Sequence, residues 1–160
     1  MLSVAPSNAD PLLHGRVVSH LALVARLLGV SPPRITGDPT IRNVRAEAGS
    51  IAYNPKWIAG RSGSAELMGA LAHEIAHLIF RDADRPDEPA RAKELRADQM
   101  AGRVLAAAQI DPTAFRNILR DLDRTRRPAF HPRLSERLAA VDAGYTITTY
   151  GARWPQPLFG

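Results

Sequence analysis

The sequence predicts an α+β domain in which a small, mostly antiparallel sheet packs on one central helix, with further helices beside it. Apolar residues recur at helical spacing in several segments, and two short strand-like runs lie between residues 41 and 54. A chain of 160 residues with 45% apolar content can form one domain with its own core. Charged residues make up 23% of the chain, which is typical of globular proteins.

Helical periodicity is clearest between residues 64 and 80, where Leu67, Leu71 and Ile75 share one face. Gly29 marks the end of an earlier helix, and prolines at 89 and 112 suit the first turns of later ones. The predicted helices span residues 12–29, 64–80, 89–108, 111–125 and 134–143, the last of them ended near Gly144.

Two strands are predicted, over residues 41–46 and 50–54, with a hairpin turn at Ala48-Gly49 between them. The pair Asn54-Pro55 would then cap a short helical turn. Residues 145–150 alternate apolar and Thr side chains as a strand would. We expect a single domain over residues 1–145 and a C-terminal tail over 146–160. Packing is the ordinary role of such a tail, and self-inhibition by occupying the active-site cleft is the alternative.

Composition limits the chemistry. The chain has no cysteine, which excludes disulfides, thiolate metal sites and a cysteine nucleophile, so any metal ion must be bound by His, Asp or Glu. The net charge is +5, and the 21 basic residues include only two lysines, Lys56 and Lys93, which leaves 19 arginines. We interpret this excess as the composition of a GC-rich genome. A nucleic-acid partner is the alternative, because charge alone is weak evidence for a partner.

We expect no membrane span. The most apolar long segment, residues 12–30, is interrupted by His14, Arg16, His20 and Arg26. The N-terminus lacks the basic stretch and short apolar run of a signal peptide. A cytoplasmic location is therefore the default expectation.

The strongest functional signal is the segment His73-Glu74-Ile75-Ala76-His77, an HExxH pattern. Residues four apart lie on the same helix face, so both imidazoles can reach one ion. Glu74 is placed to take a proton from zinc-activated water and to pass it to the leaving amine. By chance the pattern would arise in roughly one chain in a hundred of this composition. Coincidence on an amphipathic helix is therefore the weaker interpretation.

A catalytic zinc ion usually has three protein ligands and one open position, so a third ligand is expected downstream. Asp82 and Asp84 follow soon, but their register differs from HExxHxxGxxH and HExxHxxGxxD, and Phe80 stands where those patterns have Gly. Glu94 and Asp98 are better placed, because they are four apart on the next predicted helix. One carboxylate could bind zinc while the other accepts a hydrogen bond from the far nitrogen of a ligand His.

The HEIAH segment followed by Glu94-Leu95-Arg96-Ala97-Asp98 resembles the gluzincin metallopeptidases, which pair HExxH with ExxxD. Phe130-His131-Pro132 with Arg137 also resembles a motif near the end of the HtpX and CAAX prenyl protease catalytic domains. The resemblance covers about residues 50–143. Because no transmembrane helix is predicted, the chain is similar to the soluble catalytic domains called minigluzincins.

This resemblance implies a zincin-like fold and one Zn²⁺ per chain. It implies that His73, His77 and Glu94 bind the zinc ion and that Glu74 is the general base. Asp98 would orient a ligand His, for which His73 is favoured.

The resemblance also implies roles outside the metal ligands. His131 would reach the site and stabilise the oxyanion, with capping of the following helix as its alternative role. Arg137 is expected to make a structural salt bridge. In gluzincins an edge strand above the active-site helix binds substrate as an added strand. The corresponding residues here would be Ile51, Ala52, Tyr53 and Asn54.

The expected function is that of a zinc metalloendopeptidase that binds a peptide or protein substrate in extended conformation. A DNA-associated protein is one alternative, because a predicted helix has a basic face and end formed by Arg116, Arg120, Arg124, Arg126 and Arg127. A zincin fold that only binds a partner is another. The intact Glu74 argues against it, because a binding-only site needs no general base.

Overall fold

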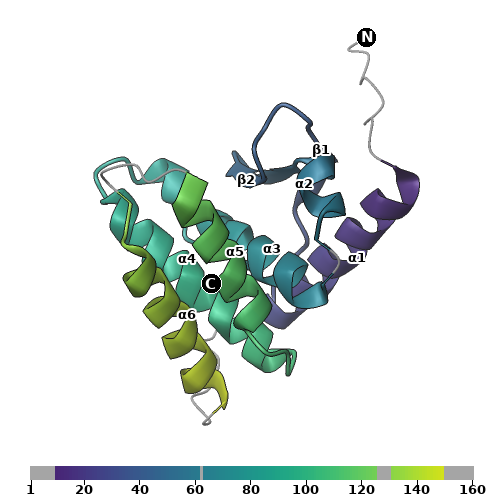
Figure 1. The fold of residues 1–160 in the computed structure, drawn as a ribbon. Helices are drawn as coiled ribbons and strands as arrows, with labels where there is room; N and C mark the ends of the chain where they lie inside the picture. The colour runs from purple at the N-terminus through teal and green to yellow at the C-terminus, as the bar shows by residue number, and fades with distance from the viewer. Residues whose placement is uncertain (1–9, 62, 126–130, 150–160) are drawn as a thin grey trace.

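The computed structural model describes residues 10–61, 63–125 and 131–149. Over these residues the chain has the α+β architecture expected from the sequence, with helices on both sides of α3 and a small sheet (Figure 1). The elements in order are α1 (Pro11–Leu28), β1 (Arg34–Gly37), β2 (Val44–Glu47), β3 (Ser50–Tyr53), α2 (Pro55–Ala59), α3 (Ser64–Ile79), the 3-10 helix η1 (Asp82–Asp84), α4 (Ala90–Ala107), α5 (Thr113–Thr125) and α6 (Leu134–Thr149).

Helix α3 is the buried centre of the fold. It packs against α1 on one side and against α4 and α5 on the other, while β2 lies across it (Figure 1). Leu71, Ala72 and Ala76 are completely buried as a result. Because the helix is covered on most sides, a polar side chain on it is costly unless it has a partner.

Local sequence signals account for two of the boundaries. Gly29 ends α1 in the left-handed conformation, at φ 70°, which glycine adopts without steric cost. The side chain of Asn54 accepts hydrogen bonds from the backbone N–H groups of Lys56 and Trp57, and so begins α2 at Pro55 as expected.

The sheet is mixed, which corrects the expectation of a mostly antiparallel one. β2 and β3 form the predicted antiparallel hairpin, but β1 pairs in parallel with the other side of β3, so the strand order is β1-β3-β2. The sequence analysis did not identify β1, because its four residues (Arg34–Gly37) carry too short an alternation. β2 also begins at Val44, later than predicted, because residues 41–43 bend after a turn at Asp38 and Thr40.

Helix α6 is longer than the sequence predicted. It continues through Gly144 to Thr149, so residues 145–149 are helical rather than strand-like. Gly144 lies where α6 crosses α4, and a Cβ there would be 1.9 Å from the carbonyl oxygen of Gln99. The glycine is therefore a close-packing position and not a helix stop. Residues 150–160, and with them the inhibitory role considered for the tail, lie outside the described residues.

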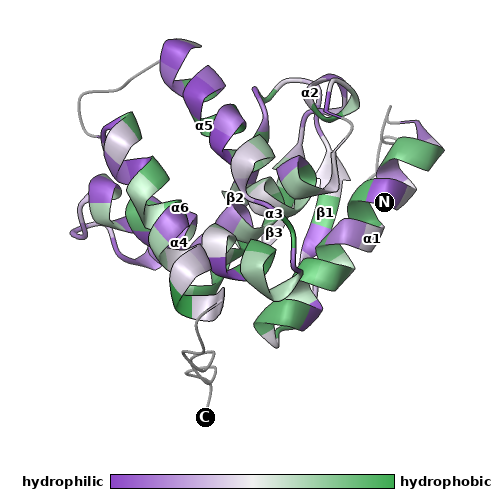
Figure 2. Cartoon of the chain, turned by 60° about the horizontal axis from the view of Figure 1, so that its bottom comes forward, coloured by the Kyte–Doolittle hydropathy of each residue, from purple (hydrophilic) through white to green (hydrophobic). Residues whose placement is uncertain are grey.

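Hydropathy differs among the helices. In Figure 2 hydrophilic residues dominate α5, whereas α1 is largely hydrophobic. Even so, no helix in the described part of the chain has the length and apolar content to cross a membrane.

We predict that Gly102→Ala and Gly144→Ala each destabilise the protein by about 1–3 kcal/mol, because overpacking would force α4 and α6 apart. A Cβ at Gly102 would lie 2.1 Å from the carbonyl oxygen of Val141. Gly15→Ala on α1 is the control: its Cβ meets nothing within 4 Å, and it should stabilise by roughly 0.5–1 kcal/mol. Urea unfolding monitored by circular dichroism measures all three. A Gly144→Ala variant as stable as wild type would contradict the close helix crossing.

Candidate metal centre

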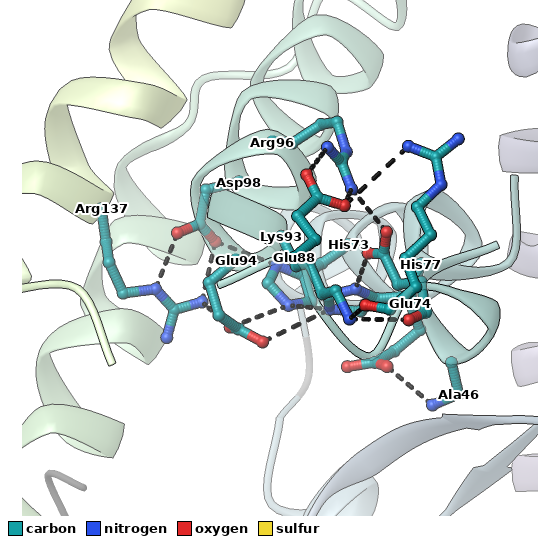
Figure 3. Close-up of polar contacts among 12 residues, drawn as sticks. Ala46, His73, Glu74, His77, Glu88, Lys93, Glu94, Arg96, Asp98 and Arg137 are labelled. Atoms are coloured by element: carbon teal, nitrogen blue, oxygen red, sulfur yellow. Dashed lines mark hydrogen bonds and ion pairs between the residues drawn. The ribbon is translucent and has the colours of Figure 1, made fainter. Parts of the chain in front are cut away.

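Two imidazoles on one face of α3 point toward the same position (Figure 3). The Nε2 atoms of His73 and His77 lie 3.0 Å apart, with the rings nearly perpendicular at 79°. His73 is buried and His77 is half-buried. Two protonated rings would repel each other at this distance, whereas two neutral nitrogens can share one cation.

Glu94 on α4 completes a group of three candidate ligands. Its Oε2 lies 3.4 Å from Nε2 of His73, and its Oε1 lies 3.5 Å from Nε2 of His77. One ligand atom from each of the three residues falls within 4.8 Å of the others, so the group could hold a metal ion. Metal–ligand bonds of about 2.0–2.1 Å in a tetrahedral site put ligand atoms about 3.3 Å apart, which the observed separations match.

The far nitrogen of His73 is held by a buried ion pair. Its Nδ1 lies 2.9 Å from Oδ1 of Asp98, whose side chain is completely buried. Arg137 on α6 donates to both oxygens of the same carboxylate, over 2.7 Å from Nε and 2.8 Å from Nη2. The sequence analysis favoured His73 as the partner of Asp98 and expected a structural salt bridge for Arg137, and both contacts are present.

A second ion pair holds the far nitrogen of His77. Its Nδ1 lies 2.7 Å from Oδ2 of Asp82, a buried residue at the start of η1. Arg96 on α4 donates to the other oxygen of that carboxylate. The two candidate ligand histidines therefore have matching supports, each made of one aspartate and one arginine.

Glu74 faces the opposite side of the cluster from Asp98. Its Oε2 accepts a hydrogen bond of 2.7 Å from the backbone N–H of Ala46 on β2, which ties the middle of α3 to the sheet (Figure 3). Burial raises the pKa of Glu74 above its usual value, and the neighbouring His73 and His77 offset part of this effect.

The charges of the candidate ligands are coupled. Burial alone would lower the pKa of His73, but its contacts with Asp98 and Glu94 outweigh burial and raise it to about 10. Burial also opposes ionisation of Glu94, yet His73 and Arg137 hold the pKa of Glu94 well below its usual range. With no cation at the cluster, a proton on His73 therefore supplies the positive charge at neutral pH.

A cavity of about 560 Å³ opens beside the cluster. Residues 42–48, which include β2, line one wall, and the buried side chains Phe115, Ile118 and Leu119 of α5 line another. His131 also lines the cavity and is exposed, in the segment just before α6. The oxyanion role expected for His131 stays a prediction.

The predicted substrate strand is wrong. Ile51, Ala52 and Tyr53 belong to β3, which is central in the sheet and hydrogen-bonded on both sides, and Asn54 is the cap of α2. A central strand has no free backbone groups for another chain. The strand next to α3 and the cavity is β2.

Sequence reasoning also missed two residues of the site. Asp82 was set aside because it does not fit a known ligand spacing, yet its carboxylate supports Nδ1 of His77. Its position five residues after His77 was the available signal, but the local loop conformation decides where its side chain points. Ala46 contributes only its backbone N–H to the contact with the Glu74 carboxylate, so the residue type at position 46 gave no signal of it.

The arginines considered for DNA binding have partners where they are described. Arg116 pairs with Asp142 on α6, Arg120 donates to Asn117, and Arg124 pairs with Asp121. Arg126 and Arg127 lie outside the described residues. The two ion pairs, made by Arg116 and Arg124, partly neutralise the basic face of α5.

Comparisons of this chain with protein-family models, with curated proteins and with solved structures give no match. The functional argument therefore depends on the geometry of the site.

We predict that zinc uptake at neutral pH releases about one proton per ion, because the proton on His73 must leave before its Nε2 can bind a metal. The pKa of His73 is raised, so competition by protons weakens as pH increases toward 10, and apparent zinc affinity should rise over that range. Isothermal titration calorimetry in two buffers with different ionisation enthalpies measures the released proton. Equal heats in both buffers would contradict the prediction.

Proposed function

We propose that this chain is a zinc-dependent metalloendopeptidase with a zincin-like, gluzincin-type site. The observation that carries the proposal is the convergence of His73, His77 and Glu94 from two helices, with Glu74 beside them and a cavity in front. Three ligands and an open position are the pattern of catalytic zinc sites, whereas structural sites use four protein ligands.

A bound zinc ion would supply Lewis acidity, which polarises a carbonyl group and lowers the pKa of a water molecule toward neutrality. The protein would supply the proton transfer. Ala46 holds Oε2 of Glu74, and no hydrogen bond from a described residue occupies Oε1. Oε1 can therefore take a proton from the attacking water and deliver it to the leaving amine. A carboxylate whose pKa is raised by burial is better matched to that exchange near neutral pH.

The substrate would bind along β2 as an added strand. The N–H of Asn54 donates to the carbonyl oxygen of Asn43, so alternation along the strand turns the backbone groups of Val44 and Ala46 away from β3. The N–H of Ala46 already donates to Glu74, which leaves the N–H and C=O of Val44 and the C=O of Ala46 for a substrate strand. The cavity follows β2 and the residues beside it, from Arg42 to Ala48, on both sides of Ala46. This length of wall suits a chain that continues past the metal centre, which favours an endopeptidase.

The wall opposite β2 would select the substrate side chain. Phe115, Ile118 and Leu119 of α5 are nearly completely buried and form the base of this wall. Leu122, one helical turn beyond Ile118, is half-buried and offers the apolar surface that a substrate side chain can contact. Close packing fixes this wall, because a Cβ at Gly69 would lie 2.4 Å from the ring of Phe115. An apolar surface gains free energy when it covers an apolar group.

We predict that Glu74→Gln keeps one zinc ion per chain and the native fold but lowers casein cleavage by about a hundredfold to ten-thousandfold, since the general base is lost. Elemental analysis, circular dichroism and a casein assay measure the three properties. Glu66→Gln, on the same helix and away from the cluster, is the matched control and should cleave as wild type does. Zinc-loaded Glu74→Gln with activity within a few-fold of wild type would rule out Glu74 as the base.

We also predict that cleavage sites carry a large apolar side chain next to the scissile bond. Mass spectrometry of a digested peptide library gives the preference directly. Leu122→Glu, at the cavity end of the α5 wall, should weaken the preference without changing zinc content. Efficient cleavage with no side-chain preference would show that α5 does not contact the substrate.

A further inference from the structure

We propose that Arg96 is a positioning residue of the metal centre, which acts on His77 through Asp82. The loop formed by residues 81–88 would serve to keep that carboxylate in place. The inference rests on the proposed function only in that the cluster of His73, His77 and Glu94 binds zinc.

The two ligand histidines differ in what holds their partners. Asp98, the partner of His73, lies on α4 one helical turn after Glu94, so regular helix geometry fixes its position. Asp82, the partner of His77, lies in the short η1 segment between two helices. A carboxylate on a loop needs its own constraints, because a loop backbone has fewer hydrogen bonds to hold it.

Arg96 supplies the first of these constraints. Its Nη2 donates to Oδ1 of Asp82, which leaves Oδ2 directed at His77. Nη1 and Nη2 also donate to the two oxygens of Glu88, at the far end of the loop. The guanidinium carbon lies 4.6 Å above the ring of Phe80, so the plane of the group is fixed as well.

The loop backbone is held from the same helix. Nζ of Lys93 donates to the carbonyl oxygens of Asp82 and Arg85, over 2.7 and 2.5 Å. Arg81 enters the loop with φ 53°, a left-handed conformation that non-glycine residues rarely adopt. Such a conformation persists only where the surroundings enforce it, and here the contacts of Lys93 and Arg96 with the loop do so.

The arrangement serves more than surface stability. Asp82 is buried, and Nε of Arg96 is buried with no hydrogen-bond partner among the described residues. Exposed ion pairs avoid that desolvation cost. What the arrangement achieves is geometric: a fixed Oδ2 keeps the proton of neutral His77 on Nδ1 and leaves Nε2 free to bind a metal ion.

The test is a double-mutant cycle on zinc affinity, measured on the full chain by competition with a chromophoric chelator. Arg96→Gln and Asp82→Ala should each weaken zinc binding by about tenfold to a hundredfold. The double variant should bind no more weakly than Asp82→Ala alone, since Arg96 acts through Asp82. Arg91→Gln is the matched control: it removes an ion pair with Glu136 from the same helix and should bind zinc as wild type does.

The absorption spectrum of bound Co²⁺ is a second measurement, which a merely structural role would leave unchanged. We expect Arg96→Gln and Asp82→Ala to shift its visible bands in the same direction, because both release His77. Additive losses of affinity in the double variant, or wild-type zinc affinity in a folded Arg96→Gln, would overturn the proposal.

Arg96→Lys keeps the charge but cannot hold Asp82 and Glu88 at once, so its affinity should lie between those of wild type and Arg96→Gln. If Arg96→Gln does not fold, Arg96→Lys decides, and wild-type affinity in Arg96→Lys would overturn the proposal. A wild-type chain that binds no zinc would instead refute the metal centre itself. Zinc binding without peptidase activity would refute the proposed function and leave this inference standing.

Discussion

The structure depends most on one buried negative charge. The side chain of Asp98 is completely excluded from solvent, and an ionised carboxylate in that position costs several kcal/mol unless its partners are well placed. It accepts hydrogen bonds from His73 on α3 and from Arg137 on α6. Three helices must therefore meet at fixed distances, and the candidate metal centre lies where they do.

Two glycines make this meeting sterically feasible. Gly102 follows Asp98 by one turn of α4, and Gly144 follows Arg137 by two turns of α6. Without side chains at these positions the two backbones can approach closely enough for the arginine to reach the aspartate. Close packing at the two glycines thus allows the ion pair between Arg137 and Asp98 to form further along the same two helices.

Helix spacing explains why the central part of the site could be predicted from the sequence. His73 and His77, and likewise Glu94 and Asp98, are pairs four residues apart, so each pair shares a face once its helix is recognised. The remaining features depend on contacts between distant segments. β1 is defined by its parallel partner β3. A glycine such as Gly144 can either end a helix or allow two helices to cross closely, and the sequence alone does not distinguish the two roles. Asp82 depends on the left-handed backbone at Arg81, which the sequence around it does not indicate.

The hydrogen bond between Ala46 and Glu74 has a consequence for motion. Because the amide of Ala46 points away from β3, its protection from exchange with deuterated solvent comes from the carboxylate rather than from the sheet. The hydrogen-exchange rate of the Ala46 amide therefore reports how often the Glu74 carboxylate leaves this hydrogen bond. A ligand that lies along β2 and leaves this hydrogen bond in place would slow the fraying of the edge strand, and exchange at the Ala46 amide would slow with it.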